Sequence, residues 1–417
     1  MNSFHFQNKK LHAESVPISD LMALYGSPLY IYSKNQIEFN WQQFDKSFGQ
    51  HPHLICYAVK ANSNLAVLNI LSKLGSGFDI VSIGELERVI AAGGDPKKCV
   101  FSGVAKTEQA IHQALKYGIY CFNVESSAEL DRIESIASDL KMKAPISIRV
   151  NPNVDAKTHP YISTGLTENK FGVDAALALI LYKKANLSAH LEVSGLDYHI
   201  GSQIIDVDPL LEALDKTLEL ITELKEEKIY LKHIDIGGGV GVAYEQESTI
   251  NINDYIQTVI TKVGNLKVIV EPGRSIVGNA GIFVTKVEYL KQNDQKSFAI
   301  IDGAMNDLLR PALYSSYHEA VTIEENKKGI HGSWDLVGPV CETTDFLAKN
   351  RSLTLEQGDY IALMTAGAYG FVLSSNYNSR PRVPEVMVSG SQHQMIRKRE
   401  TIESLFKNEM ILKDEIN

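Results

Sequence analysis

Short apolar runs rich in strand-forming residues alternate with stretches of helical spacing eight times along the first two thirds of the chain. The runs are Leu54–Val59, Phe78–Val81, Cys99–Ser102, Ile119–Val124, Ile146–Val150, Gly195–Ile200, His233–Ile236 and Lys267–Val270. Helical spacing is clearest in Leu65–Leu74, Ile83–Ala92, Ser127–Leu140, Pro209–Glu226 and Asp254–Val263. Thr107 and Ser126 stand where two of these helices would begin and are suitable capping residues.

This alternation predicts repeated βα units and therefore a parallel sheet. Eight units over roughly 220 residues agree with the repeat count and size of a (β/α)8 barrel, which we therefore expect. An open, doubly wound sheet is the alternative, but no feature of the sequence marks the reversal of strand order that it requires.

The pattern changes after Gly281, where strand-like runs follow one another with few helical stretches between them. These runs are Ile282–Tyr289, Phe298–Ile301, Trp334–Val340, Tyr360–Met364 and Glu385–Val388. They predict a second, mostly antiparallel β domain, either a barrel or a sandwich. The early segment Pro28–Tyr32 is also strand-like and is a candidate for the same domain. We expect the barrel in residues 35–280 and the β domain in residues 1–34 and 281–417.

The length of 417 residues suits two domains, or one large domain with an appendage, and the composition, 44% hydrophobic and 22% charged, is that of a globular protein. The formal net charge of −9 argues against non-specific binding to nucleic acid. The N-terminal residues lack the apolar core of a signal peptide, and no apolar run approaches the ~18 residues of a membrane span. Four scattered cysteines show neither disulfide nor metal-finger spacing, so we expect thiols, no metal site and a cytoplasmic location.

Polar residues or glycines stand in or just after most of the predicted barrel strands. They are Lys60, Asp79, Asn123, Asn151, His199–Ser202, Gly237–Gly239 and Glu271–Arg274. A loop residue or a hydrogen-bonded core residue is the simpler interpretation of any one of them. Seven of eight strands with such residues at the same end favour an active site, because the C-terminal face of a barrel carries the catalytic residues.

The glycines in "HIDIGGGVG" follow a strand but do not complete a dinucleotide fingerprint, because Val242 stands where the last glycine would be needed. Consecutive glycines still allow backbone amides to approach an anion closely. Ser202 could add a hydroxyl donor. We therefore expect a phosphate group to bind near Gly237, Gly238 and Gly239.

Lys60, in "CYAVKAN", follows a strand that is predicted to be buried, so it either reaches for water or is held for its amine. An amine in this place could form a Schiff base with pyridoxal 5'-phosphate, whose phosphate the glycines would hold. Glu271, after the apolar run of "KVIVEPGR", would then keep the ring nitrogen protonated. His199 either lies flat on the ring or is a hydrogen-bonded core histidine, and the residues alone leave both open.

The sequence resembles the diaminopimelate decarboxylase family from about Gly26 to Ser389. The resemblance rests on "YAVKAN", "FDIVSIGELE", "DYHIGSQ", "IDIGGGVG", "EPGRS", "DGAMNDLLRPALY", "GPVCETTD" and "AGAYG", which stand in the order of the family. It implies a pyridoxal-phosphate-dependent lyase that converts meso-2,6-diaminopimelate to L-lysine and CO2, the last step of lysine biosynthesis. It also implies a barrel that binds the cofactor, and an obligate homodimer in which the β domain helps to form the partner's active site.

The resemblance also assigns roles to individual residues of this chain. Lys60 is the Schiff-base lysine, Glu271 the partner of the pyridine nitrogen and His199 the residue stacked on the ring. The remaining cofactor-binding residues are Asp79, Ser202, Gly237, Gly238, Gly239, Pro272, Gly273, Arg274 and Tyr369. Arg274, Arg310, Tyr314 and Tyr369 bind the substrate with Glu342, and Cys341 is the proton donor. Two arginines suit a substrate with two carboxylates.

Three other interpretations remain open. A decarboxylase of ornithine, arginine or a related basic amino acid has the same fold as the family that this sequence resembles. The pocket segment of such enzymes is similar to "CDGxD", whereas this chain has "CETTD". An amino-acid racemase is similar to the barrel but has an arginine in the place of Glu271. A small pyridoxal-phosphate homeostasis protein is a barrel alone, which the long β-rich segment after Gly281 disfavours.

Overall fold

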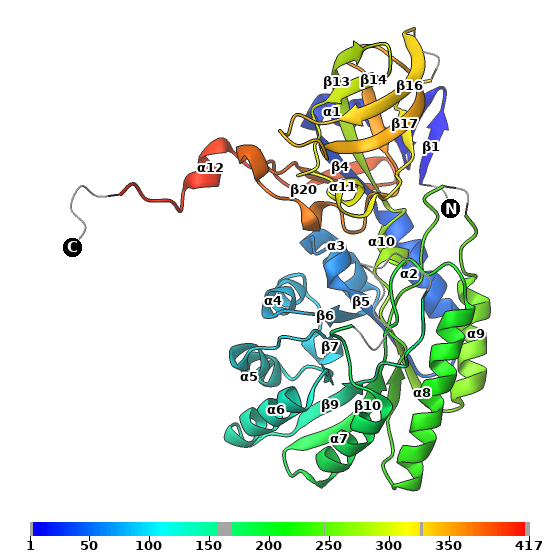
Figure 1. The fold of residues 1–417 in the computed structure, drawn as a ribbon, viewed down its shortest axis with the longest axis vertical. Coiled ribbons are helices and arrows are strands. Elements are labelled where there is room, and N and C mark those ends of the chain that lie inside the picture. Colours follow the sequence, from blue (N-terminus) through cyan, green and yellow to red (C-terminus); the bar gives the residue numbers. More distant parts are fainter. Residues whose placement is uncertain (1–2, 157–168, 246, 326–327, 413–417) are drawn as a thin grey trace. The chain divides into compact units, whose positions relative to one another are not determined.

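The protein is described here by a computed structural model that covers residues 3–156, 169–245, 247–325 and 328–412. The chain divides into two compact units (Figure 1). The barrel unit consists of residues 36–279, and the β unit consists of residues 1–35 and 280–417.

The barrel unit contains a closed barrel of eight parallel strands, which confirms the predicted architecture and excludes the open sheet. The strands are β5 (His53–Ala58), β6 (Gly77–Ile80), β7 (Cys99–Phe101), β8 (Cys121–Val124), β9 (Ala144–Arg149), β10 (Leu191–Asp197), β11 (His233–Asp235) and β12 (Lys267–Val270). The last strand pairs with the first through Val268 opposite His53, and this pairing closes the ring.

Helices follow the strands and surround the barrel (Figure 1). They are α3 (Leu65–Lys73), α4 (Ile83–Ala91), α5 (Glu108–Tyr117), α6 (Ser127–Asp139), α7 (Ala175–Leu187), α8 (Asp208–Glu226), α9 (Ile252–Val263) and the short α10 (Arg274–Val277), while α2 (Lys34–Phe48) precedes β5. Asn64, Thr107 and Ser126 accept hydrogen bonds from backbone amides in the first turns of α3, α5 and α6, as the sequence predicts.

The barrel strands are continuous apolar runs because helices cover one face and the packed barrel interior covers the other. Every residue of β5 from Leu54 to Ala58 is buried, and all residues of β6, β7 and β8 are buried. A charged residue inside such a strand is therefore costly unless it is paired or functional. Asp79 in β6, Asp197 in β10 and Asp235 in β11 are the buried aspartates of these strands.

The β unit contains the strands β1 (Phe4–Gln7), β2 (Lys10–Ala13), β3 (Val16–Pro17), β4 (Leu29–Ser33), β13 (Gly281–Gln292), β14 (Ser297–Ile301), β15 (Ala320–Thr322), β16 (Ile330–Val337), β17 (Phe346–Leu355), β18 (Tyr360–Leu363), β19 (Glu385–Ser389) and β20 (Gln392–Arg397). Its main sheet has the order β17-β16-β14-β13-β4-β19-β20. Most pairs are antiparallel, and β4 lies between β13 and β19. The prediction that Pro28–Tyr32 joins the β domain is thereby confirmed.

Two features of this sheet differ from the sequence prediction. The strand predicted at Trp334–Val340 is β16, which begins at Ile330 and ends at Val337, because Gly338 and Pro339 leave the ladder. Strands β17 and β20 were not predicted, since their polar and charged residues obscure the alternation of a half-exposed strand. The helices of the unit are α1 (Ile18–Tyr25), α11 (Arg310–Tyr314) and α12 (Ile402–Phe406).

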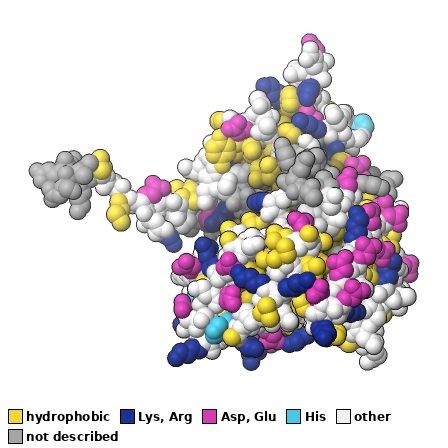
Figure 2. Space-filling view, turned by 60° about the horizontal axis from the view of Figure 1, so that its bottom comes forward, with side chains coloured by type: hydrophobic (Ala, Val, Ile, Leu, Met, Phe, Trp, Pro, Cys, Tyr) yellow, Lys and Arg dark blue, Asp and Glu magenta, His cyan; other side chains and the backbone are white. Residues whose placement is uncertain are grey.

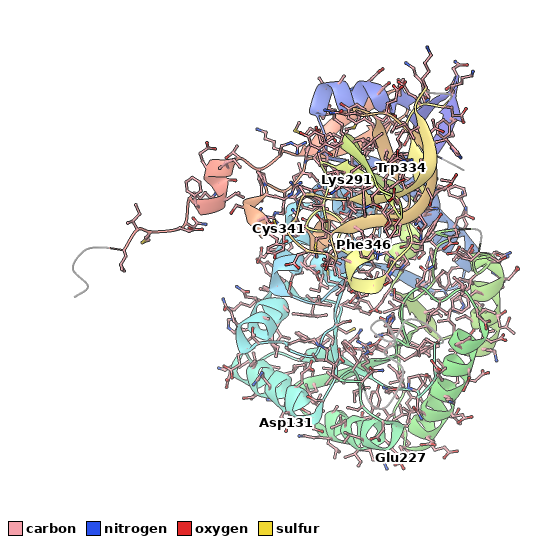
Figure 3. The ribbon with its side chains drawn as sticks, turned by 45° about the horizontal axis from the view of Figure 1, so that its top comes forward. Asp131, Glu227, Lys291, Trp334, Cys341 and Phe346 are labelled. Carbon is pink, nitrogen blue, oxygen red and sulfur yellow. The ribbon has the colours of Figure 1, made fainter. Side chains whose placement is uncertain are left out.

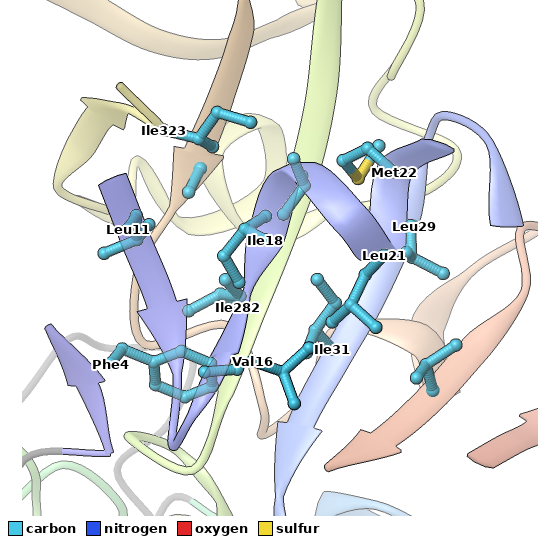
Figure 4. Close-up of a cluster of buried hydrophobic side chains, with 14 of the residues drawn as sticks. Phe4, Leu11, Val16, Ile18, Leu21, Met22, Leu29, Ile31, Ile282 and Ile323 are labelled. Carbon is cyan, nitrogen blue, oxygen red and sulfur yellow. The ribbon is translucent and has the colours of Figure 1, made fainter. Parts of the chain in front are cut away.

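The N-terminal strands and α1 pack on the main sheet of the β unit through a buried apolar cluster (Figure 4). Leu11, Ile18 and Leu21 lie against Ile31 of β4 and Ile282 of β13. These five side chains are at most 2% exposed. The two ends of the chain's sequence therefore contribute to one hydrophobic core.

Acidic and basic side chains are both spread over the face seen in Figure 2, in keeping with the modest net charge. None of the helices within the described part of the chain is both long and apolar enough to cross a membrane.

Candidate active site

Lys60 lies at the C-terminal rim of the barrel, in the single turn η1 (Val59–Ala61) that follows β5. Its Nζ donates to Oδ2 of Asp79 at 2.5 Å. The Asp79 carboxylate is fully buried, whereas the Lys60 side chain is 40% exposed. The lysine is therefore anchored by a buried carboxylate while its amine remains accessible to a ligand.

Three further carboxyl groups gather at this rim, from Asp197 at the end of β10, Asp235 at the end of β11 and Glu271 after β12. Their nearest oxygens lie within 4.8 Å of one another, and all three residues are buried. Asp235 Oδ1 accepts a hydrogen bond from the Gly237 amide at 3.0 Å. Ser102 Oγ lies 3.5 Å from Glu271 Oε1. The rim thus brings several buried carboxyl groups close together.

Burial and the neighbouring charges of Asp235, Asp79 and Asp197 raise the pKa of Glu271 well above its usual range, and the Lys60 ammonium offsets only part of this. Burial also raises the pKa of Asp235 to about 7. Without a bound cation, Asp235 and Glu271 therefore stay protonated at pH values at which exposed carboxyl groups have lost their protons. A cationic group bound beside Glu271 would allow its carboxylate to ionise.

His199 follows β10 and lies beside the glycine run. The Gly238 amide donates to His199 Nδ1 at 3.2 Å, so Nδ1 carries no hydrogen and the neutral ring is protonated at Nε2. Burial, assisted by the Arg149 and Lys60 charges, lowers the pKa of His199 well below its usual range. The side chain is therefore a neutral, planar ring at the rim, a form that suits stacking on another aromatic ring.

The glycines after β11 are required by close packing of the backbone. Gly237 and Gly239 have φ values of +65° and +105°, and a Cβ on Gly238 would lie 2.2 Å from the Glu271 carbonyl oxygen. The Glu271 amide in turn donates to the Gly237 carbonyl at 2.7 Å. The glycine run thus holds the ends of β11 and β12 together. Its predicted binding of a phosphate group stays a prediction.

Polar donors lie on the same rim at the start of α10. Arg274 is buried, and its Nη1 and Nη2 donate to Tyr244 Oη at 2.6 Å and to Ser202 Oγ at 3.2 Å. Gly273 precedes it, and a Cβ there would approach Ala58 and Ala61 to 3.0 Å. The Pro272 carbonyl accepts from the Ala58 amide at 3.1 Å. Segment 272–274 therefore packs directly on the strand end that carries Lys60.

In the β unit, the predicted substrate residues Arg310 and Tyr314 form the two ends of the short helix α11. Arg310 is buried, and its Nη1 lies 3.0 Å from His318 Nε2. Because the guanidinium can only donate, Nε2 accepts and His318 Nδ1 donates to the Met364 carbonyl at 2.8 Å. His318 is thus held in one tautomer and orients the arginine.

Cys341 and Glu342 lie on the loop between β16 and β17 (Figure 3). Cys341 is exposed, and its amide donates to Asn378 Oδ1 at 3.2 Å. The Glu342 carboxylate accepts a short hydrogen bond from Tyr377 Oη. Asp345 supports the base of the loop by accepting from the Val340 amide at 2.7 Å.

Tyr369 follows β18 and has a φ of +56°, a left-handed conformation that is uncommon for a residue with a side chain. The next residue is Gly370, where a Cβ would lie 2.6 Å from the Ala366 carbonyl oxygen. The backbone of the AGAYG segment is therefore held in a demanding conformation. Such conformations are concentrated at functional sites.

Within the barrel unit the structure connects most of the predicted rim residues by contacts. Lys60 and Asp79, His199 and Gly238, Glu271 and Gly237, and Ser202 and Arg274 are hydrogen-bonded pairs. Arg310, Tyr314, Cys341, Glu342 and Tyr369 all belong to the β unit.

Sequence reasoning missed Asp197 and Asp235 in the barrel unit and His318 and Tyr377 in the β unit. Both aspartates interrupt apolar strands in the same way as Asp79, so the same signal could have identified them. Neither His318 nor Tyr377 stands in a pattern that sets it apart.

The chemistry of the rim fits a molecule that carries both a cationic ring and a phosphate group, such as pyridoxal 5'-phosphate protonated at its ring nitrogen. Asp79, Asp197, Asp235 and Glu271 outnumber the nearby cations Lys60 and Arg149, so a protonated ring nitrogen would supply missing positive charge. Arg274 with Ser202 provides donors for an anionic group. Carboxylate oxygens at these distances are also ligands that a hard divalent cation accepts.

Comparisons with known proteins agree with this geometry. Residues 34–278 match the family described as pyridoxal-dependent decarboxylase, pyridoxal binding domain. The diaminopimelate decarboxylase of Vibrio cholerae is 53% identical over 416 residues, which cover 99% of this chain and 100% of that protein. The structure of the diaminopimelate decarboxylase from Helicobacter pylori complexed with L-lysine aligns with a TM-score of 0.91 at 46% identity and covers 94% of this chain and 99% of that one.

A lysine/ornithine decarboxylase from Vibrio vulnificus, in a complex with putrescine, aligns with a TM-score of 0.77. Its identity is 23%, and the alignment covers 89% of this chain and 96% of that one. At this identity the likeness concerns the fold alone, so it does not favour that substrate class.

Proposed function

Since this chain belongs to the diaminopimelate decarboxylase family of pyridoxal-dependent decarboxylases, we propose that it converts meso-2,6-diaminopimelate to L-lysine and carbon dioxide. The observation that carries the proposal is the accessible Lys60 amine beside the buried cluster around Glu271. The same arrangement makes pyridoxal 5'-phosphate the cofactor.

When bound, the cofactor accepts the electron pair that the departing carboxyl group leaves behind. Lys60 would hold the cofactor covalently through Nζ and would serve again in product release. The Glu271 carboxylate would favour a proton on the ring nitrogen, and the neutral His199 ring would support the cofactor's ring. Asp79 orients the Lys60 ammonium before the cofactor binds.

The cofactor's phosphate is held by the residues at the other part of the rim. Arg274 supplies the positive charge and Ser202 the hydroxyl group, and their mutual hydrogen bond orients both. Amides of the run Gly237–Gly239 and of Gly273 add donors. The family resemblance also assigns Tyr369 of the β unit, whose backbone is left-handed, to the cofactor's phosphate.

The substrate has two carboxylates and two amines, and the candidate residues carry complementary charges. Arg274 and Arg310, with Tyr314, grip carboxylates through planar or hydroxyl donors. The Glu342 carboxylate binds the distal ammonium. Cys341 Sγ delivers a proton to the carbon from which carbon dioxide has left.

The active site is shared between two copies of this chain in a homodimer. Cys341 supports this inference, because an exposed thiol that serves as a proton donor requires a surface that excludes water from the reaction. We infer a cytoplasmic location from the thiol state of all four cysteines.

The test is an assay of purified, cofactor-loaded protein with meso-diaminopimelate, in which lysine and carbon dioxide are measured together. An ornithine or lysine substrate lacks the distal carboxylate and would leave an arginine poorly paired. Discrimination in kcat/KM should therefore reach roughly 100-fold or more. Equal turnover of ornithine would assign the protein to the basic-amino-acid decarboxylases. Interconversion of enantiomers without carbon dioxide release would assign it to the racemases.

A further inference from the structure

A pocket lies at the N-terminal ends of the barrel strands, away from the candidate active site. Its volume is about 340 Å³, and its wall includes His53 and Lys267, the first residues of β5 and β12. Lys98 and Tyr120 line it just before β7 and β8. The strands that begin at His53 and Lys267 are those after which Lys60 and Glu271 stand, so the pocket and the rim lie at opposite ends of β5 and β12.

Positive charge dominates the lining of this pocket, through Lys97, Lys98 and Lys267. Asp45 is its one carboxylate among the described lining residues, and it contacts His53 Nε2 at 3.2 Å. Among all residues that the structure describes, none forms an ion pair with Lys98 or Lys267. The pocket therefore has an excess of cations that nothing in the described chain neutralises.

The two inner lysines are not freely solvated surface residues. Both are half-buried. Lys267 Nζ donates to Tyr120 Oη at 3.2 Å and lies 4.7 Å from the centroid of the Tyr120 ring. Lys98 Nζ donates to the Gly75 carbonyl at 3.1 Å. Neutral oxygens thus hold both ammonium groups in place at the pocket wall.

The pKa of Lys267 also indicates an excess of positive charge at this pocket. Burial lowers the pKa of Lys267, and the Lys98 charge lowers it further, while the neighbouring Cys56 and Cys121 act in the opposite direction. The Lys98 charge repels the half-buried Lys267 ammonium, and an anion bound beside the two lysines would relieve this repulsion and the loss of hydration at Lys267. Trp41 also lines the pocket, and its buried Nε1 has no hydrogen-bond acceptor among the described residues.

We propose that this pocket binds a small molecule carrying a phosphate or carboxylate group, with Lys98 and Lys267 as its anion-binding residues. The volume admits a metabolite of modest size, and Leu54, Ile55 and Leu74 provide apolar contacts for its body. The site is separate from the cofactor's phosphate site, and the inference does not depend on the proposed reaction.

The test is calorimetric titration of the cofactor-loaded full chain at constant ionic strength, with pyrophosphate as the phosphate probe and citrate as the carboxylate probe. Loading with cofactor prevents the probes from binding at Arg274. Saturable binding of one probe molecule per chain is expected. The Lys98→Met/Lys267→Met variant keeps the aliphatic stems and should weaken binding about tenfold or more. The Lys183→Met variant is the control, because Lys183 is exposed and paired with Glu227.

The relative strength of the two probes identifies the source of the anionic group. No saturable binding of either probe, or equal affinity in the double variant, would overturn the proposal. A second measurement needs no substitution: the better probe should protect Lys98 and Lys267, but not Lys183, from acetylation mapped by mass spectrometry. Unchanged labelling at saturating probe would also contradict it.

Discussion

The barrel rim and the loop between β16 and β17 both carry candidate catalytic residues, but they hold them in opposite ways. At the rim, Asp79, Asp235 and Glu271 are buried, and strand ends and backbone amides fix them. On the loop, Cys341 is exposed, and one side-chain oxygen of Asn378 supports its amide. The rim is a closely packed site whose buried carboxyl groups outnumber the nearby cations, whereas the loop presents reactive groups to the outside.

This difference indicates what each region needs to become active. The rim needs a cation, which the protonated ring of the cofactor would supply in the proposed arrangement. The loop needs a surface that covers Cys341 and Glu342, which a second copy of the chain supplies in the proposed dimer. Buried charged groups and exposed reactive groups are thus divided between two parts of the chain.

The largest effect is expected at the rim, for Lys60→Ala. Decarboxylation should fall by at least about 10³-fold, because the amine that attaches the cofactor and releases the product is lost. Borohydride treatment of the unaltered enzyme should fix the cofactor to Lys60, as mapped by peptide mass spectrometry. The internal control is Lys106, which is buried and already donates to Gly103, Asn123 and Glu129. Labelling at Lys106 instead would refute the role of Lys60.

The second-largest effect is expected for Cys341, and it tests whether the loop between β16 and β17 contributes to the active site of the partner subunit. Cys341→Ala should lower activity by about 10²-fold or more, since it removes a proton donor. Co-expression of Cys341→Ala with Lys60→Ala should restore activity, because a mixed dimer has one intact site. Random pairing of subunits gives about a quarter of the unaltered activity. If mixed dimers form and remain inactive, each subunit builds its site alone.

The same contrast explains what could be predicted from the sequence. The barrel strands are buried on both faces, so their apolar runs were recognisable one by one, and Lys60 and Glu271 stood out against them. Strand β17 is partly exposed and β20 has no buried residue, and their polar side chains hid both strands. Sequence reasoning reached Asp79 but passed over Asp235, although both interrupt a buried strand.

Other contacts could not be predicted from the sequence because they depend on tertiary packing. Tyr377 meets Glu342 from 35 positions away, and the adjacent Asn378 has a left-handed backbone with φ of +56°. His318 orients Arg310 across a turn that begins with Ser315 in a left-handed conformation. No local periodicity encodes such placements. The N-terminal strands likewise owe their positions to the shared core with β4 and β13.

A smaller effect should appear in the pH dependence of stability. The pKa of Asp235 rises from its ordinary value of 3.8 to about 7 on folding, chiefly through burial. Between these values the folded state binds the extra proton, so the free energy of unfolding falls as pH rises, by about 1.4 kcal/mol per pH unit for one proton.

The cofactor-free protein should therefore lose stability between pH 5 and pH 7 in urea unfolding experiments. Asp235→Asn should show a shallower slope, because its amide does not titrate. Bound cofactor should also flatten the slope by supplying a cation to the cluster. Identical slopes in the variant and the unaltered protein would mean that Asp235 ionises normally and that the rim is not short of positive charge.

The smallest effect concerns the support of the loop, in Tyr377→Phe. The variant removes the hydroxyl group that donates to Glu342 but keeps the ring. Because the residue is 44% exposed, water can replace the lost hydrogen bond, and the carboxylate will be less well oriented rather than lost. KM for diaminopimelate should rise about three- to tenfold with little change in kcat. Tyr289→Phe is the matched control, since Tyr289 is 61% exposed on β13. An unchanged KM in Tyr377→Phe, or an equal rise in the control, would show that the loop positions Glu342 without this contact, and the rim and the loop would then differ less in how they hold their residues.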